Sequence, residues 1–319
     1  MINTNAKIKK TVIFAGYHCN NRCIFCINYD KRNIPSPSTK DIKKEIILAK
    51  KRGSTYLELI GGEPTIRPDI IELIQFAKKI GFNTIMIATN GRMLSYYEFA
   101  EKILKAGLNS IVFSIHGHNA KLHDSLTQVP GSFKQINQGI KNVKEIIKKM
   151  HLNVSLGTNT TIVKQNYKYL FQIGEYIRKL GLYNAEFIFV DPSYGGAYNF
   201  FDKLVPKISE IAPYVHKCLD IGKKYKIPHW HIRYVPLCYF TDYLNQISEL
   251  HEIEIYDNTE HVAPDFYDED AIRNRQEKGR LKTKKCKGCI LYNKCEGLWK
   301  EYIKRYGDAE LKPVKTINK

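Results

Sequence analysis

Eight cysteines are the residues of this sequence best suited to chemistry, and six of them fall into two short groups. The first group, Cys19, Cys23 and Cys26, has the spacing CxxxCxxC. Three thiolates this close together can ligate three irons of a [4Fe–4S] cube, because such clusters select soft sulfur ligands. The next cysteine is Cys218, so one iron is expected to stay open for another ligand. Structural zinc is the alternative, although zinc also requires a fourth local ligand.

The second group, Cys286, Cys289 and Cys295, has the spacing CxxCx5C. A loop this rich in cysteine indicates a metal site. Its three thiolates also lack a fourth, and Cys238 is the candidate because it follows a proline in a loop-like segment. Cys218 lies in a helical apolar pattern and is interpreted as a small core residue. Four cysteines do not by themselves distinguish zinc from an iron–sulfur cluster.

Alternating strands and helices must position these groups. Apolar runs predict six strands, at residues 11–16, 56–60, 84–88, 110–115, 152–158 and 186–190. Helical patterns predict helices at residues 38–51, 69–80, 96–106, 135–150, 167–180 and 206–225. This alternation predicts an α/β fold with a parallel sheet built from βα units. In such sheets the chemistry collects at the C-terminal ends of the strands, which is where the first cysteine group lies.

The residues at these strand ends carry a family resemblance. CxxxCxxC after the first strand, with Phe25 before its last cysteine, resembles the radical S-adenosylmethionine superfamily. The segment GGEP (61–64) follows the second strand, TNG (89–91) follows the third, and SIHG (114–117) closes the fourth, where that family would place such motifs. The resemblance covers roughly residues 8–225 and implies a partial (β/α)6 TIM-like barrel.

The resemblance also implies a cofactor and a reaction. S-adenosylmethionine would chelate the open iron, and one electron would cleave it to a 5′-deoxyadenosyl radical that abstracts hydrogen from a substrate. Gly61 and Gly62 would let the backbone approach the methionyl amino group, and Glu63 would place a carboxylate near it. Ordinary strand-end capping is the alternative for Ser114 and Asn159. The cofactor-binding residues are thus expected to be Phe25, Gly61, Gly62, Glu63, Asn90, Ser114 and Asn159.

The second cysteine group resembles the auxiliary-cluster domains called SPASM and, in a shorter form, twitch. The SPASM pattern continues with a further cysteine at the position that Trp299 occupies here. This departure favours a single auxiliary [4Fe–4S] cluster, and a zinc knuckle stays the alternative. We therefore expect a barrel domain at residues 1–225 and a small C-terminal iron–sulfur domain at residues 226–319.

Two carboxylates are candidate catalytic residues. Glu58 and Glu186 alternate with apolar residues on predicted strands and can point into the barrel, where either could bind substrate or accept a proton. A salt bridge within the barrel is an equally good interpretation. His116, His118 and His123 follow the fourth strand and are interpreted as ordinary loop histidines.

Composition limits the environment and the partners. The 319 residues carry 50 Lys and Arg against 32 Asp and Glu, a formal charge of +18, which reflects either composition bias or an anionic partner. No apolar run approaches the length of a membrane span or a signal-peptide core, so a cytoplasmic protein with reduced thiols and no membrane partner is expected.

The substrate expected from the resemblance is a ribosomally made peptide or protein. A cofactor precursor, a nucleotide sugar or another small molecule is the second choice, and RNA is left open. A low-potential electron donor is a further expected partner. A zinc- or cluster-dependent nucleic-acid-binding protein is the alternative from another class, but the intact GGEP segment and first cysteine group count against it.

Overall fold

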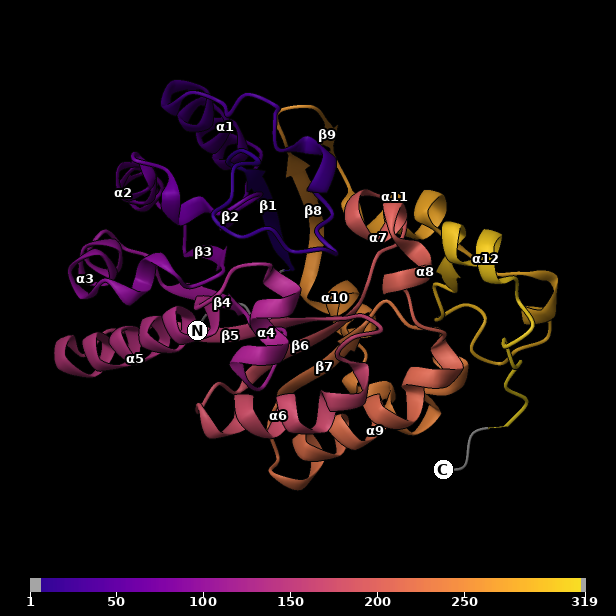
Figure 1. The fold of residues 1–319 in the computed structure, drawn as a ribbon. Helices are drawn as coiled ribbons and strands as arrows, with labels where there is room; N and C mark the ends of the chain where they lie inside the picture. The colour runs from indigo at the N-terminus through magenta and orange to yellow at the C-terminus, as the bar shows by residue number, and fades with distance from the viewer. Residues whose placement is uncertain (1–6, 317–319) are drawn as a thin grey trace.

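A mainly parallel sheet forms the centre of the computed structural model, which describes residues 7–316 (Figure 1). Within those residues the order is β7-β6-β5-β4-β3-β2-β1-β8-β9, and only the β8–β9 pair is antiparallel. The fold is therefore the α/β partial barrel that was predicted. The strands are β1 (Ile8–Phe14), β2 (Tyr56–Ile60), β3 (Thr84–Thr89), β4 (Ser110–Ser114), β5 (Ser155–Ile162), β6 (Asn184–Phe189), β7 (His229–Arg233), β8 (Tyr256–Val262) and β9 (Tyr267–Asp268).

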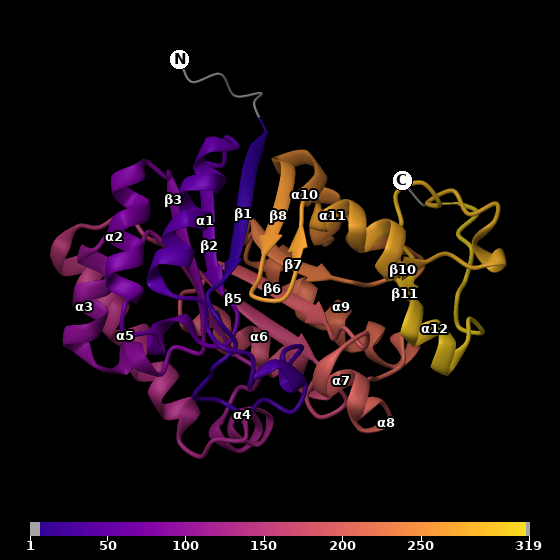
Figure 2. The ribbon, with the colours of Figure 1, turned by 90° about the horizontal axis from the view of Figure 1, so that it is seen from above.

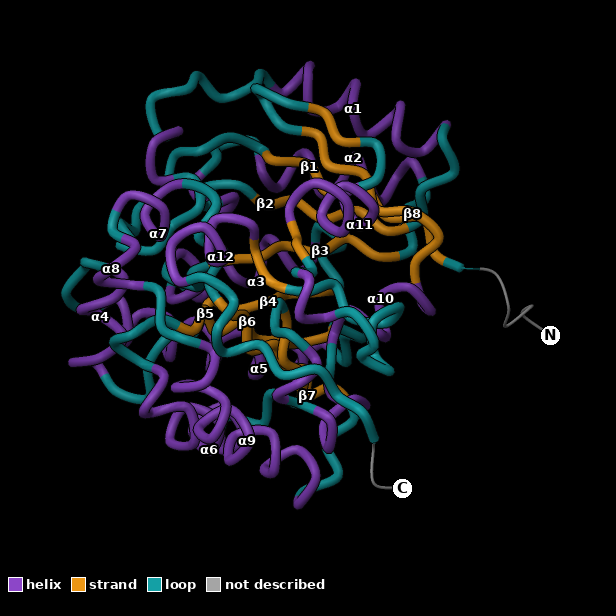
Figure 3. Tube along the Cα trace, turned by 90° about the vertical axis from the view of Figure 1, so that its right-hand side faces the viewer, coloured by secondary structure: helices purple, strands orange, loops and turns teal. Residues whose placement is uncertain are grey.

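Six helices lie on the outside of the sheet, where Figures 1 and 3 show them surrounding the strands. Each buries an apolar stripe: α1, for example, places Ile42, Ile46 and Ala49 in the same core as Leu57 and Leu59 of β2. Complete burial of a Leu or Ile side chain stabilises the fold by about 1.5–3 kcal/mol. The helices are α1 (Thr39–Lys51), α2 (Ile70–Ile80), α3 (Tyr97–Lys105), α5 (Ser132–Met150), α6 (Leu170–Lys179) and α9 (Ile208–Lys224).

The segment between β1 and α1, residues 15–38, contains the first cysteines and is called the cysteine loop here. It ends at α1 because Ser38 and Asp41 form a capping box, in which each side chain accepts a hydrogen bond from the other residue's backbone N–H. Three short helices, α4 (Ala120–Thr127), α7 (Gly195–Asn199) and α8 (Phe201–Leu204), surround the loop at the C-terminal ends of the strands (Figure 2).

Backbone hydrogen bonds hold the cysteine loop against these short helices. Arg22 N–H donates to the carbonyl of Thr127 (2.9 Å), and Ile24 N–H donates to that of Leu126 (3.1 Å), both on α4. On the other side, Gly196 N–H of α7 donates to the Cys26 carbonyl (2.9 Å). The loop is thus fixed across the mouth of the barrel.

The chain beyond residue 225 adds two parallel strands to the sheet: β7 pairs with β6, and β8 pairs with β1. The predicted division into domains at residue 225 stays a prediction. Figures 1 and 2 show the last segment to one side of the barrel. The remaining elements are α10 (Ser248–Ile255), α11 (Ala271–Asn274), β10 (Arg280–Leu281), β11 (Leu298–Trp299) and α12 (Lys300–Tyr306). Among residues 7–316, no helix has both the length and the apolar character needed to cross a membrane.

Candidate active site

The three cysteines of the cysteine loop are partly buried together. Burial raises the pKa of Cys19 to about 11 and also raises the pKa of Cys23 and Cys26. The positive charge of Arg32 acts in the opposite direction on all three thiols. A thiolate in such a site is costly unless positive charge compensates it. The donor set therefore fits a group that brings several iron ions and accepts three thiolates.

Gly61 and Gly62 are required where the cysteine loop meets the end of β2. A Cβ on Gly62 would lie 2.0 Å from the carbonyl oxygen of His18, and one on Gly61, whose φ is +123°, would lie 2.2 Å from that of Gly16. Gly62 N–H donates to the Gly16 carbonyl (2.8 Å), and Glu63 N–H donates to the His18 carbonyl (2.8 Å). The glycines thus let the cysteine loop pack directly on β2, a reason that the sequence did not reveal. Their predicted role at the methionyl group stays a prediction.

Glu63 joins the ends of β2 and β3. Its carboxylate is 3% exposed and accepts hydrogen bonds from Thr65 N–H (3.0 Å), Thr65 Oγ1 (2.5 Å), Thr89 Oγ1 (2.7 Å) and Asn90 N–H (2.7 Å). Burial raises its pKa, and these hydrogen bonds oppose the shift. The carboxylate is therefore already satisfied by the protein, and its predicted contact with an ammonium group stays a prediction.

Asn90 connects this corner to the cysteines. Its side-chain N–H₂ donates to Asn20 Oδ1 (2.6 Å) and lies 3.8 Å from Cys19 Sγ. A second connection comes from Arg67, whose guanidinium donates to the carbonyls of Ala15 (2.6 Å) and Pro37 (3.2 Å), at the two ends of the loop. Sequence reasoning missed Arg67, because nothing in its local pattern shows that its partners lie in the loop.

Ser114, Asn159 and Glu186 occupy one row across β4, β5 and β6, since Ser114 is in register with Asn159 and Asn159 with Glu186. Ser114 and Asn159 are partly exposed, and their predicted contacts with the cofactor stay predictions. Glu186 accepts a hydrogen bond from Arg233 of β7 (2.9 Å). The other candidate carboxylate, Glu58, pairs with Lys10 of β1 (3.2 Å). The structure thus gives both carboxylates the salt-bridged environment that was the alternative to catalysis, and their catalytic roles stay predictions.

Phe25 points from the cysteine loop toward β4. Its ring meets His116 edge to face, with centroids 4.7 Å apart, and His116 stacks on His123 at 6.0 Å. Burial lowers the pKa of His116 to about 3 and that of His123 to about 4, so both are neutral. His116 lies in the loop after β4, as predicted, whereas His123 lies on α4 and not in a loop. Both are buried and support the phenylalanine, which the polar sequence around them did not indicate.

The remaining four predicted ligands meet at a second place. Cys238, Cys286, Cys289 and Cys295 line one cavity, although 48 positions separate the first two in the sequence. Burial, together with the three neighbouring thiols, raises the pKa of Cys238 to about 11. Among residues 7–316, no three Cys, His, Asp or Glu side chains converge on one point as ligands of a single metal ion do. The structure brings these cysteines together, and their metal-binding role stays a prediction.

Backbone N–H groups point at the sulfurs of this second group. Cys295 Sγ accepts from Leu237 N–H (3.4 Å) and Gly297 N–H (3.3 Å), and Cys289 Sγ accepts from Val314 N–H (3.3 Å). Such bonds stabilise thiolates and tune iron–sulfur clusters. By contrast, Cys218 is buried in α9, as predicted, and its carbonyl accepts a hydrogen bond from the Trp230 indole (2.9 Å).

Comparison with curated proteins identifies relatives over the barrel. The chain is 31% identical over 177 residues to the AdoMet-dependent heme synthase of Methanosarcina barkeri, a match that covers 55% of this chain and 48% of the synthase. It is 28% identical over 218 residues to a probable GTP 3′,8-cyclase of Saccharolobus islandicus, covering 68% and 67% of the two chains. The chain thus matches about half the length of the synthase.

Solved structures and a family model complete the comparison. The fold is similar to Streptococcus suis SuiB bound to its precursor peptide SuiA, with a TM-score of 0.66, 17% identity, and coverage of 98% of this chain and 75% of SuiB. The radical SAM superfamily model matches residues 13–181, which include the cysteine loop and the ends of β2, β3, β4 and β5. The chain belongs to the radical SAM superfamily and is a radical SAM enzyme.

Proposed function

We propose that this enzyme modifies a peptide or protein side chain, using a radical formed at the cysteine loop and an auxiliary [4Fe–4S] cluster held by Cys238, Cys286, Cys289 and Cys295. The observation that carries the proposal is that these four cysteines, from two distant segments, line one cavity, and that backbone N–H groups donate to the sulfurs of Cys289 and Cys295. The domain that contains this second site begins, in this proposal, after residue 225.

The residues of the barrel have distinct tasks in this proposal. The bound cluster and S-adenosylmethionine supply one-electron cleavage and hydrogen abstraction. Cys19, Cys23 and Cys26 would hold the cluster, and Phe25, whose ring packs on His116, would contact the cofactor. Ser114 and Asn159 offer a hydroxyl and an amide to its polar groups from neighbouring strands. The cysteine loop, fixed to α4 and α7, covers the mouth and limits access of water to the radical.

The peptide substrate is supported by fold similarity to SuiB, which has been solved with a precursor peptide bound, over nearly the whole of this chain. At 17% identity this similarity extends to the fold alone, so the substrate class is inferred and not established by it. A small-molecule substrate is the second candidate, because the curated relatives with higher identity are a heme synthase and a probable GTP cyclase.

The test is production of 5′-deoxyadenosine by anaerobically reconstituted enzyme with each class of substrate. We expect a precursor peptide encoded beside the gene to increase 5′-deoxyadenosine and to change mass itself, whereas GTP has no effect. The triple variant Cys19→Ala, Cys23→Ala, Cys26→Ala is the control that lacks the radical. Stimulation by GTP with no change in any peptide would replace the peptide proposal by the small-molecule one.

A further inference from the structure

Helix α10 packs with its charged face toward the interior. It buries the carboxylates of Glu249 and Glu252, each 5% exposed, whereas its Ile253 and Ile255 are 45% and 43% exposed. Burial of a carboxylate is costly unless a cation compensates its charge, and Glu is almost never fully buried without such a partner. The orientation of this helix is therefore set by charged partners in the interior rather than by burial of its apolar side chains.

Glu252 is the middle member of a series of five paired charges. Its carboxylate pairs with Arg233 of β7 (3.4 Å) and with Arg275, which follows α11 directly (2.8 Å). Arg233 pairs in turn with Glu186 of β6 (2.9 Å), and Arg275 donates two hydrogen bonds to Glu296 (2.9 and 2.8 Å). Although burial acts in the opposite direction, the two arginines lower the pKa of Glu252 to about 2, so its carboxylate is ionised. These five residues are called the ion-pair series here.

One end of the ion-pair series lies in the barrel, and the other lies at the second cysteine group. Glu186 shares its row with Asn159 and Ser114, and it projects from the face of β6 opposite to the side chains that pack in the core. This row is called the interior row here. At the other end, Glu296 follows Cys295 directly in the sequence. The series therefore connects the row expected to face the cofactor with the segment that carries the second thiols.

Arg280 provides a second connection between the same two places. Its guanidinium, in a residue that is 2% exposed, donates to the carbonyl of Tyr234 (3.3 Å), just after β7, and to that of Gly297 (2.7 Å). Tyr234 has a φ of +70°, a left-handed conformation that strains a residue other than glycine. Its N–H donates to Glu249 of α10 (2.6 Å). The end of β7 is thus held in a strained conformation by bonds from α10 and from Arg280.

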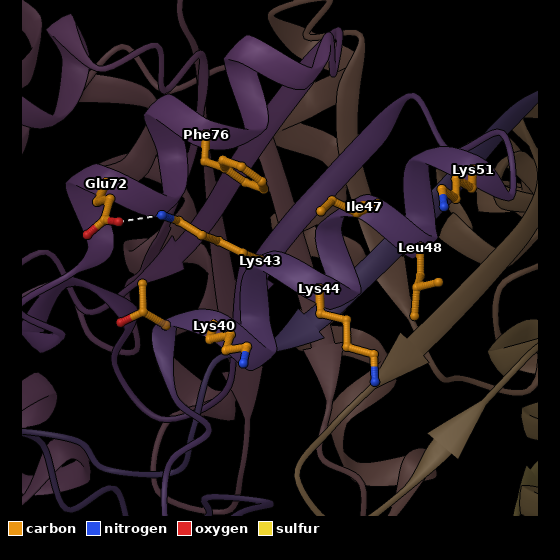
Figure 4. Close-up of a pocket in the computed structure, with 9 residues that line it drawn as sticks. Lys40, Lys43, Lys44, Ile47, Leu48, Lys51, Glu72 and Phe76 are labelled. Atoms are coloured by element: carbon orange, nitrogen blue, oxygen red, sulfur yellow. Dashed lines mark hydrogen bonds and ion pairs between the residues drawn. The ribbon is translucent and has the colours of Figure 1, made fainter.

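An ion pair at the surface of the barrel provides a comparison. Lys43 of α1 pairs with Glu72 of α2 beside a shallow groove, and the two side chains are 28% and 57% exposed (Figure 4). Such a pair contributes little, because water and salt screen its charges. In the ion-pair series, by contrast, the side chains of Arg275, Glu252 and Glu296 are 10%, 5% and 7% exposed. Loss of Arg275 would remove a directly bonded cation from two buried carboxylates, which is strongly destabilising.

We propose that Arg275 is a positioning residue that couples the second cysteine group to the interior row, so that metal binding at the one and S-adenosylmethionine binding beside the other strengthen each other. Cys295, once it ligates a metal, is fixed in place, and the adjacent Glu296 is fixed with it and orients Arg275. The remaining pairs carry this order to Glu186. The inference rests on the proposed function, because it takes the four cysteines as metal ligands and the interior row as the cofactor-facing surface. Such coupling is reciprocal: each ligand raises the affinity for the other by the same factor.

The experiment compares Arg275→Lys with Arg273→Lys. Lys keeps the charge of Arg275, but its single ammonium group cannot reproduce the planar fork that holds Glu296 with two bonds and reaches the next carboxylate as well. Arg273 is the matched control, because it lies two residues away and pairs with Glu277 at the surface, where the two side chains are 71% and 57% exposed.

Both lysine variants are also combined with Cys238→Ala, which removes a ligand of the second group. In anaerobic protein reconstituted with iron, we measure the iron content, the affinity for S-adenosylmethionine by equilibrium dialysis, and the EPR spectrum of the reduced cysteine-loop cluster with saturating S-adenosylmethionine. The spectrum should be the same in all variants, which shows that the cluster itself is intact.

We expect Arg275→Lys to weaken S-adenosylmethionine binding about fivefold or more, within the usual range of coupling between sites. Arg273→Lys should match the wild type. Cys238→Ala should weaken S-adenosylmethionine binding to the same extent as Arg275→Lys, and the combination of the two should cause no further loss, because both break the same connection.

Equal affinities in the two lysine variants, or losses that add in the combined variant, would overturn the positioning role of Arg275. If the wild type binds about four irons rather than about eight, at four per cluster, the auxiliary cluster of the proposed function fails instead. In that case the comparison of Arg275→Lys with Arg273→Lys still decides whether Arg275 positions the interior row.

Discussion

Replacement of Gly62 by Ala tests how the cysteine loop is positioned. The new Cβ would lie 2.0 Å from the His18 carbonyl oxygen, so the loop or the end of β2 must move by about 1 Å to reach 3.0 Å, the shortest separation that such atoms show. Strain of this kind costs about 1–3 kcal/mol. A displacement of about 1 Å at a reacting centre can lower the rate about a hundredfold. We therefore expect lower iron retention and slower 5′-deoxyadenosine formation, with only a moderate loss of stability to urea.

Gly53→Ala is the matched control for this variant. Gly53 has a φ of +91° but nothing within 4 Å of an added Cβ. Its replacement carries a backbone cost of about 1–2 kcal/mol, since left-handed geometry disfavours Ala, but it displaces no neighbour. The two variants should thus lose similar stability, while only Gly62→Ala loses iron and rate. Equal iron content and equal rates in the two variants would refute the argument that contact with His18 sets the loop position.

Three further predictions follow from the sites. Alanine at any of Cys19, Cys23 or Cys26 should abolish 5′-deoxyadenosine formation with dithionite, and activity near that of the wild type in one variant would contradict the ligand set. The wild type should bind about eight irons per chain, at four per cluster, and Cys238→Ala should lose iron whereas Cys218→Ala should not; zinc in elemental analysis would indicate a knuckle. Lowering the pH from about 6.5 toward 4 should lower the melting temperature, because buried His116 and His123 have lowered pKa values and the unfolded chain binds protons that the folded chain excludes. A melting temperature that stays constant over this range would contradict it.

The parts of the fold that the sequence predicted have strong local signals. Apolar runs and helical periodicity are sufficient for the six βα units, because their strands are covered by helices. The strands after residue 225 were missed. Among them, β7 and β8 were missed because His229–Arg233 and Tyr256–Val262 are rich in polar residues and owe their strand conformation to pairing with distant segments. For the same reason the predicted strand at 152–158 starts too early and stops too soon: β5 continues through Thr160 and Thr161 to Ile162.

Some features of the candidate site could likewise be predicted from the sequence, and others could not. Cysteine spacing and strand-end motifs identify the residues that meet at the mouth, since the topology of a parallel sheet brings strand ends together. The sequence could not show that the Glu63 carboxylate accepts hydrogen bonds from Thr65, Thr89 and Asn90, because those bonds depend on how two loops pack. Arg67 and Arg32 were missed because a lone arginine carries no positional signal.

The pairing of β1 with β8 has a consequence for how the enzyme is made. The cysteine loop follows β1 directly in the chain. Two residues of the loop contact Asp265, just after β8: the Tyr17 hydroxyl donates a hydrogen bond to its carboxylate, and Lys31 forms an ion pair with it (2.7 Å). During synthesis β1 emerges first, yet its second neighbour follows only after residue 262. Until then β1 is an unprotected edge, which invites aggregation. Loading of iron should therefore come late, after most of the chain has left the ribosome, and a chain truncated after α9 should neither retain the cluster nor stay soluble.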